Sequence, residues 1–225
     1  MRPMQTDTTR EAVMQLYSFF NSSTSYRVRI ALALKGLDYE TVGINLRKHE
    51  QKEAGYLAIN PSGVVPTLVD GDVRLSQSLA IIDYLDATYP EPRLIPLDPE
   101  LRMRVLEVSN AVSCDIHPVN NLRILRYLKD EFGIGDEQRN AWYRHWVTEG
   151  MVGIEAMLER HGSGPYCFGD TPTLADCCLV PQVANALRTN CDLHPYPRVM
   201  SAYEHANAQP AFVAAQPSRQ PDFIA

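Results

Sequence analysis

A change of hydrophobic pattern on either side of a proline-rich stretch limits what this chain can fold into. Residues 88–99 (TYPEPRLIPLDP) hold four prolines in twelve positions, which is typical of a linker. Before this stretch, short strand patterns alternate with helical ones in the order β-α-β and then β-β-α. After it, apolar residues recur only at helical spacing. The sequence therefore predicts an α/β domain over residues 14–90 and an all-α domain over residues 98–221.

Turn residues divide the α/β part into elements. The aromatic segment QLYSFF (15–20) predicts the first strand, and Gly36 ends the helical pattern that follows it. We expect a second strand at 39–46, a hairpin turn at 70–72, and a helix opened by Ser76–Ser78.

Four helical segments are expected beyond the linker. Apolar positions at helical spacing cover 99–130 and 137–161. The segment Thr173–Asp176 has the spacing of a capping box, which predicts that a third helix begins there. A last helix is expected near 198–208, followed by a loose tail after Pro210.

Charge and cysteine content exclude several kinds of partner. The net charge is −6 and the 21 Lys and Arg residues form no run, so nucleic acid and anionic membrane surfaces are not expected partners. No uncharged stretch reaches the ~18 apolar residues of a membrane helix.

The five cysteines lack C-x-x-C spacing, which predicts reduced thiols, no metal site and a cytoplasmic location. The first 13 residues are polar and lack a secretion signal, so we expect either a disordered leader before the first element or a native chain that begins at Met14.

A serine-rich turn, Ser22–Ser25, lies between the first strand and the first helix. Hydroxyls beside the free N–H groups of a helix N-terminus stabilise an anion, including the thiolate that is the reactive form of sulfur. The same turn is also typical of a plain helix cap. The turn alone leaves both interpretations open.

Two further segments of the α/β part have both a functional and a structural interpretation. A cis peptide at Val65-Pro66 would present the Val65 backbone to a ligand, although a trans proline at a strand start is the commoner case. At Gln77-Ser78, the serine either caps its helix or binds a ligand carboxylate together with nearby N–H groups.

A polar cluster interrupts the helical pattern of the second domain. His117 and Asn121 are four residues apart and would share one face of a helix, and Arg123 follows them. A lone histidine at such a place is usually structural, but a cluster that breaks the apolar pattern is also typical of a cleft.

Taken in order, these segments resemble the zeta class of glutathione transferases, the maleylacetoacetate isomerase family. The resemblance covers nearly the whole chain, from Met14 to Pro221. The segments that carry it are Ser22–Leu32 (SSTSYRVRIAL), Asn60–Leu68 (NPSGVVPTL), Gln77–Ile82 (QSLAII), Gly169–Asp176 (GDTPTLAD), Leu179–Ala186 (LVPQVANA) and Asp192–Pro197 (DLHPYP).

The resemblance implies a thioredoxin-like N-terminal domain, an all-α C-terminal domain, a homodimer, and glutathione bound where the domains meet. It places Ser22, with Ser23 beside it, at the glutathione sulfur as catalytic residues. The further expected contacts with glutathione are Gln51, Val65, a cis Pro66, Gln77, Ser78 and Asn121. The residues expected at a dicarboxylate substrate are His117, Arg123 and Arg188. The family's best-known activities are cis-trans isomerisations of maleylacetoacetate or maleylpyruvate, with glutathione as cofactor.

One departure from the family pattern bears on the substrate. An arginine that would help to bind a dicarboxylate commonly precedes the two serines, and here that position is Asn21. Asn21 therefore favours a glutathione transferase that conjugates or dehalogenates small electrophiles, whereas the His117–Arg123 cluster and Arg188 favour the isomerase. We expect the isomerase. A non-catalytic glutathione-binding module is a third interpretation, and the hydroxyl of Ser22 argues against it.

Overall fold

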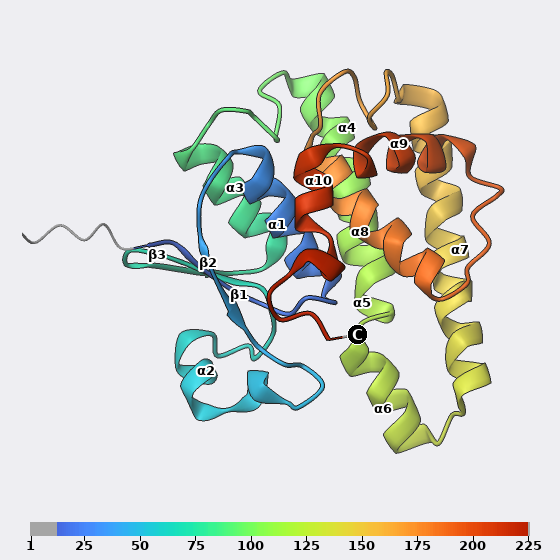
Figure 1. Cartoon of the computed structure of the whole chain (residues 1–225). Coiled ribbons are helices and arrows are strands. Elements are labelled where there is room, and N and C mark those ends of the chain that lie inside the picture. Colours follow the sequence, from blue (N-terminus) through green and yellow to red (C-terminus); the bar gives the residue numbers. More distant parts are fainter. Residues whose placement is uncertain (1–12, 225) are drawn as a thin grey trace, which may run out of the picture.

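A four-stranded sheet occupies one side of the molecule and helices form the rest (Figure 1). The computed structural model describes residues 13–224; the polar segment at positions 1–12 lies outside the described residues. The strands are β1 (Gln15–Ser18), β2 (Glu40–Gly43), β3 (Thr67–Asp70) and β4 (Val73–Ser76). Their order in the sheet is β2-β1-β3-β4, with β1 parallel to β2 and antiparallel to β3. The first two strands are shorter than the sequence predicts.

Alternate residues of β1 point into two different cores. Leu16 is fully buried in the main core, together with Ile30 of α1 (Ser23–Leu34) and Ile82 of α3 (Ser78–Thr88). Tyr17 lies against Tyr56 of α2 (Ala54–Ile59), with ring centroids 5.9 Å apart. This alternation follows from the two-residue period of a strand. It puts α1 and α3 on one face of the sheet and α2 on the other (Figure 1).

The helix α8 (Leu174–Arg188) lies at the centre of the helical part and packs against α1, α4 (Pro99–Asn110) and α9 (Pro197–Asn207). Its capping box is confirmed, because Thr173 accepts from the Ala175 N–H and Asp176 accepts from the Thr173 N–H. The long helix α7 (Asp136–His161) runs along the outside (Figure 1). None of the helices described is both long enough and apolar enough to cross a membrane.

The continuous helical pattern predicted over 99–130 is interrupted in the structure. After α4 come a π-helical turn (Ala111–Ile116), the short α5 (His117–Val119) and then α6 (Leu122–Phe132). Pro118 has no N–H to continue a helix, and Asn121 is extended and caps α6 instead. Single π-turns inside helices are frequent at functional sites.

The expectation of a loose tail after Pro210 is wrong. Residues Pro210–Ala215 form α10, which packs against α1, and Phe212 is fully buried. Further on, the Asp222 carboxylate accepts from the Phe20 N–H at 2.8 Å. Burial of Phe212 and this hydrogen bond fix the segment onto the α/β part.

Candidate active site

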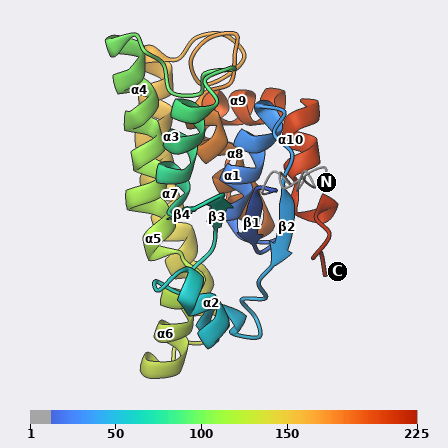
Figure 2. The same cartoon turned by 90° about the vertical axis from the view of Figure 1, so that its left-hand side faces the viewer.

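A cleft of about 670 Å³ opens between the α/β part and the helical part. Figures 1 and 2 both place α2 and α6 at the same end of the molecule, where this cleft lies. We call its two sides the N-terminal wall (residues 19–65) and the helical wall (residues 117–189). Of the predicted site residues, those that line it are Ser22, Ser23, Gln51, Val65, His117, Asn121, Arg123 and Arg188.

The N-terminal wall begins with the serine-rich turn, where Ser22 caps α1. Its Oγ accepts from the Ser25 N–H at 3.2 Å and lies 2.8 Å from the Thr24 hydroxyl. Thr24 in turn donates to the Val65 carbonyl at 3.1 Å. These contacts place the N-terminus of α1, with its free N–H groups and positive dipole end, at the edge of the cleft.

Two other groups of this wall can bind a peptide-like ligand. Gln51 is buried, and its Oε1 has no hydrogen-bond partner within residues 13–224. A buried acceptor without a partner is costly, and a ligand N–H would satisfy it. The Val65-Pro66 peptide is cis, and Val65 lines the cleft just before β3.

The polar cluster of the helical wall reaches across to the serine-rich turn. His117 Nδ1 lies 3.2 Å from Ser23 Oγ, and His117 Nε2 lies 3.1 Å from Asn121 Nδ2. Asn121 Oδ1 accepts from the Arg123 N–H at 3.1 Å, which makes Asn121 the N-cap of α6. His117 and Asn121 are therefore in contact, as their spacing predicts, although they do not belong to one helix.

The environment of His117 keeps its imidazole neutral. Burial is the main cause of a pKa lowered to about 3, and the positive charges of Arg27 and Arg123 lower it further. A group with this pKa carries no charge near neutral pH.

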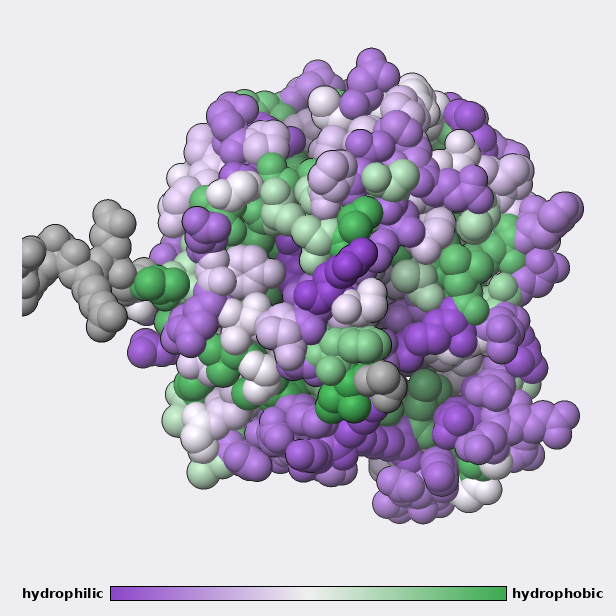
Figure 3. All heavy atoms as spheres, in the orientation of Figure 1, coloured by the Kyte–Doolittle hydropathy of each residue, from purple (hydrophilic) through white to green (hydrophobic). Residues whose placement is uncertain are grey.

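The charged side chains that line the cleft are basic. Seven of them line it, and the described part of the chain contributes no acidic one: Arg47, Lys52, Arg123, Arg126, Lys129, Arg139 and Arg188. In a protein of net charge −6, this concentration makes the cleft attractive to anions. The space-filling view shows hydrophilic residues over most of the surface on the side drawn in Figure 1 (Figure 3).

Five of these cations were not predicted from the sequence. Arg126 and Lys129 follow Arg123 at three-residue steps, so the helical spacing of α6 could have revealed them. Arg47, Lys52 and Arg139 are distant in sequence, and only the fold brings them together.

The helical wall contains two further residues that the sequence did not single out. Gln182 of α8 is buried, and its Nε2 has no partner among the described residues. Tyr143 of α7 is buried as well, which raises its pKa to about 12, so that it remains a neutral phenol. Both line the cleft near Arg188, whose guanidinium donates to Asn185 Oδ1 at 3.0 Å.

Three of the predicted residues, Pro66, Gln77 and Ser78, are not part of the cleft lining. Gln77 has a φ of 74°, a conformation that non-glycine residues rarely adopt. Ser78 begins α3 and accepts from the buried Arg27 guanidinium at 3.3 Å. The structure thus places Gln77 and Ser78 at the junction of β4 and α3.

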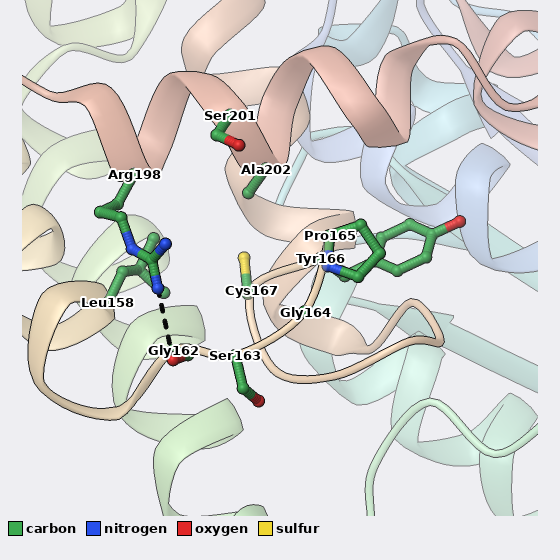
Figure 4. A pocket seen from close by; sticks show the side chains of 10 residues that line it. All are labelled: Leu158, Gly162, Ser163, Gly164, Pro165, Tyr166, Cys167, Arg198, Ser201 and Ala202. Carbon is green, nitrogen blue, oxygen red and sulfur yellow. Dashed lines mark hydrogen bonds between the residues drawn. The ribbon is translucent and has the colours of Figure 1, made fainter.

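A second hollow, between the end of α7 and α9, is too small for a ligand (Figure 4). Its volume is about 10 Å³, and one water needs roughly 10–15 Å³. Arg198 donates to the Gly162 carbonyl at its edge. Within residues 13–224, no three His, Cys, Asp or Glu side chains lie together in a way that could hold a metal ion.

Known proteins match this chain over almost its full length. Residues 12–87 match the glutathione S-transferase N-terminal domain, and residues 140–206 match the C-terminal domain. The chain is 48% identical to a probable maleylacetoacetate isomerase of Vibrio cholerae serotype O1, over 92% of this chain and 97% of that protein.

Two solved structures have nearly the same fold. One is the holo structure of a maleylpyruvate isomerase, described as a bacterial glutathione S-transferase of the zeta class. Its TM-score is 0.91, with 45% identity over 93% of this chain and 100% of that one. The other is a maleylacetoacetate isomerase of Methylobacterium extorquens AM1 with bound malonate and glutathione. Its TM-score is 0.90, with 37% identity over 94% of this chain and 100% of that one.

Proposed function

The chain belongs to the glutathione S-transferase family, and we propose that it is a glutathione-dependent cis-trans isomerase of maleylacetoacetate or the related maleylpyruvate. One observation carries the proposal. A helix N-terminus with two serine hydroxyls, suited to a thiolate, shares a cleft with seven basic and no acidic side chains of the described chain, suited to a dicarboxylate.

Residues of the N-terminal wall fit glutathione. The unpartnered Oε1 of Gln51 would accept an N–H of the tripeptide, and the Val65 backbone would pair with its cysteinyl residue. Gln77 and Ser78, at the start of α3, would hold its γ-glutamyl end, and Asn121 would lie beside it.

When bound, glutathione supplies a thiolate that adds to the cis double bond and leaves after that bond has rotated. The protein has two tasks in this reaction. The N-terminus of α1, with Ser22 and Ser23, stabilises negative charge on the sulfur. Arg123 and Arg188 hold the substrate carboxylates and stabilise charge that moves onto the carbonyl oxygen.

A conjugating or dehalogenating transferase is the second candidate, and Asn21 favours it. Asn21 lines the cleft at the position where the family resemblance leads us to expect an arginine, so the N-terminal wall would offer one cation fewer to a dicarboxylate. Such an enzyme would need the thiolate site but not the basic helical wall.

Purified protein separates the two functions. With glutathione present, each protein molecule should convert many molecules of maleylacetoacetate or maleylpyruvate, as followed by the absorbance of the conjugated enol. Omission of glutathione should abolish this conversion. No turnover with either diacid, together with conjugation of a chloro-nitrobenzene, would contradict the isomerase and support the transferase.

We further propose a homodimer in the cytoplasm, with domains at residues 14–90 and 98–221. Leu97, Leu101 and Met103, just before or on α4, are large apolar side chains exposed in the single chain, and a second copy could cover some of them. The five free cysteines suit a reducing compartment. Sedimentation equilibrium of the purified chain tests the dimer, and a monomer at micromolar concentration would contradict it.

A further inference from the structure

The hydrogen bonds that join Asn121, His117 and Ser23 determine which side-chain atom donates and which accepts in each pair. The Arg123 N–H can only donate, so the Asn121 atom that faces it must be the carbonyl oxygen Oδ1. The amide nitrogen of Asn121 therefore faces His117, at 3.1 Å from Nε2. The N-cap of α6 thus determines the orientation of this amide.

The orientation of Asn121 then determines the tautomer of His117. Because the Asn121 amide nitrogen donates, Nε2 of a neutral imidazole must be the acceptor and Nδ1 carries the proton. Nδ1 lies 3.2 Å from Ser23 Oγ, so the imidazole donates to the serine. The Ser23 hydroxyl has no other hydrogen bond within residues 13–224, and its own proton is free.

The neighbouring hydroxyl of Ser22 is in the opposite situation. Thr24 donates its proton to the Val65 carbonyl, so in the Ser22–Thr24 contact the donor must be Ser22. The Ser22 oxygen also accepts from the Ser25 N–H. In this structure the Ser22 hydroxyl donates its proton within the turn, whereas the Ser23 hydroxyl, which lines the cleft, has no acceptor for its proton among residues 13–224.

We propose that Asn121 and His117 are positioning residues that hold the Ser23 hydroxyl as a hydrogen-bond donor toward the glutathione sulfur. This inference rests on the proposed function, and it names a role for His117 other than contact with the substrate. Arg27 and Arg123 are the charged groups near the imidazole, and both disfavour its protonation. The helical wall thereby supports the thiolate site of the N-terminal wall.

Asn121→Asp is the variant that reverses this arrangement with the least change in shape. Aspartate caps helices as well as asparagine does, so the Arg123 N–H keeps its acceptor. The second carboxylate oxygen can only accept from Nε2, so Nε2 must carry the proton. Nδ1 then becomes an acceptor and takes the proton of Ser23 away from the sulfur. At mildly alkaline pH we expect the pKa of the bound glutathione thiol to rise by about one unit, which is a tenfold loss of thiolate stabilisation.

A double-mutant cycle separates this effect from simple repulsion by the new charge. The pKa of the bound thiol is measured by thiolate absorbance in the original protein, in Asn121→Asp, in Ser23→Ala and in the double variant. Repulsion would be the same with or without the Ser23 hydroxyl, whereas the proposed effect needs it. Asn140→Asp, at an exposed position in the same cleft that does not bond to His117, measures the repulsion alone.

A second measurement needs no ligand. Nitrogen chemical shifts of the His117 ring should show the neutral tautomer protonated at Nδ1 in the original protein and at Nε2 in Asn121→Asp. Additive effects in the cycle, or any other protonation state of His117 in the original protein, would overturn the proposal. Absence of glutathione binding by the original protein would refute the proposed function instead, and the ring nitrogens would still report the tautomer.

Discussion

The N-terminal wall of the cleft offers mainly hydroxyls, backbone groups and an amide oxygen, whereas the helical wall offers five of the seven basic side chains and a neutral imidazole. Hydroxyls and N–H groups at a helix start suit a single anionic sulfur. Long cationic side chains suit carboxylates whose positions differ between substrates. The two walls therefore divide the work between activation of the thiol and binding of the diacid.

This division predicts that damage to each wall changes a different kinetic constant. The N-terminal wall should govern turnover and glutathione affinity, and the helical wall should govern the KM of the diacid. The one expected exception is the contact between Ser23 and His117, which joins the walls.

The largest effect is expected at the serine-rich turn. Ser22→Ala should lower kcat by about tenfold or more, because the Ser22 hydroxyl, through Thr24 and Ser25, holds the turn that places the N-terminus of α1 and the Ser23 hydroxyl at the sulfur. It should also lower the free energy of unfolding by about 1 kcal/mol, because Ser22 caps α1. Asp98→Ala removes the exposed cap of α4 and is the matched control. If both variants keep full turnover, the turn is only a cap.

Arg188→Gln should raise the KM of the diacid by about tenfold, because a hydrogen bond to a charged group contributes about 1.5–3 kcal/mol. The dissociation constant of glutathione, measured by calorimetry, should stay the same. Arg104→Gln removes a partly exposed guanidinium of α4 outside the cleft and serves as the control. A loss of glutathione affinity without a change in the KM of the diacid would show that Arg188 binds glutathione and not the diacid.

Ionic strength should affect the two kinds of substrate differently. The KM of a diacid should rise several-fold between low and high salt, since the Debye length shrinks from about 30 Å at 0.01 M to about 3 Å at 1 M. The KM of a neutral chloro-nitrobenzene should hardly change. Equal salt dependence for both would mean that the seven cations do not attract the diacid.

The smallest effect concerns His117 and stability. Its folded pKa is lowered to about 3, so between the unfolded value of about 6.5 and pH 3 the unfolded chain binds a proton that the folded chain does not. Stability should therefore fall as the pH drops through this window, by at most about 1.4 kcal/mol per pH unit from this group. Urea unfolding at several pH values measures the slope, and His117→Gln should flatten it. An unchanged slope would show that folding does not lower the pKa of His117.

Local signals explain why the sequence predicts the serine-rich turn of the N-terminal wall and the helix that follows it. The serines beside the first helix and the sharp stop at Gly36 act within a few residues, and the structure places them as expected. The fold class and the capping box of α8 also depend on local pattern, and both are confirmed.

Long-range packing explains what the sequence could not predict. The helical pattern over 99–130 stops near Pro118 and starts again at α6, with Asn121 as its N-cap. The apolar periodicity of the whole segment does not show this interruption. The tail after Pro210 is ordered because Phe212 finds a buried site against α1. Arg47 and Arg139 meet in one cleft only after both parts have folded.

A pH titration of glutathione bound to the protein decides whether this site activates a thiol. Thiolate absorbance would be followed at saturating protein, with Ser22→Ala alongside. We expect a thiol pKa at least about one unit below the ordinary value of about 8.5, as for sulfur at other helix N-termini, and a higher value in the variant. A bound thiol with the pKa of free glutathione, or no binding at all, would contradict thiolate stabilisation at the start of α1.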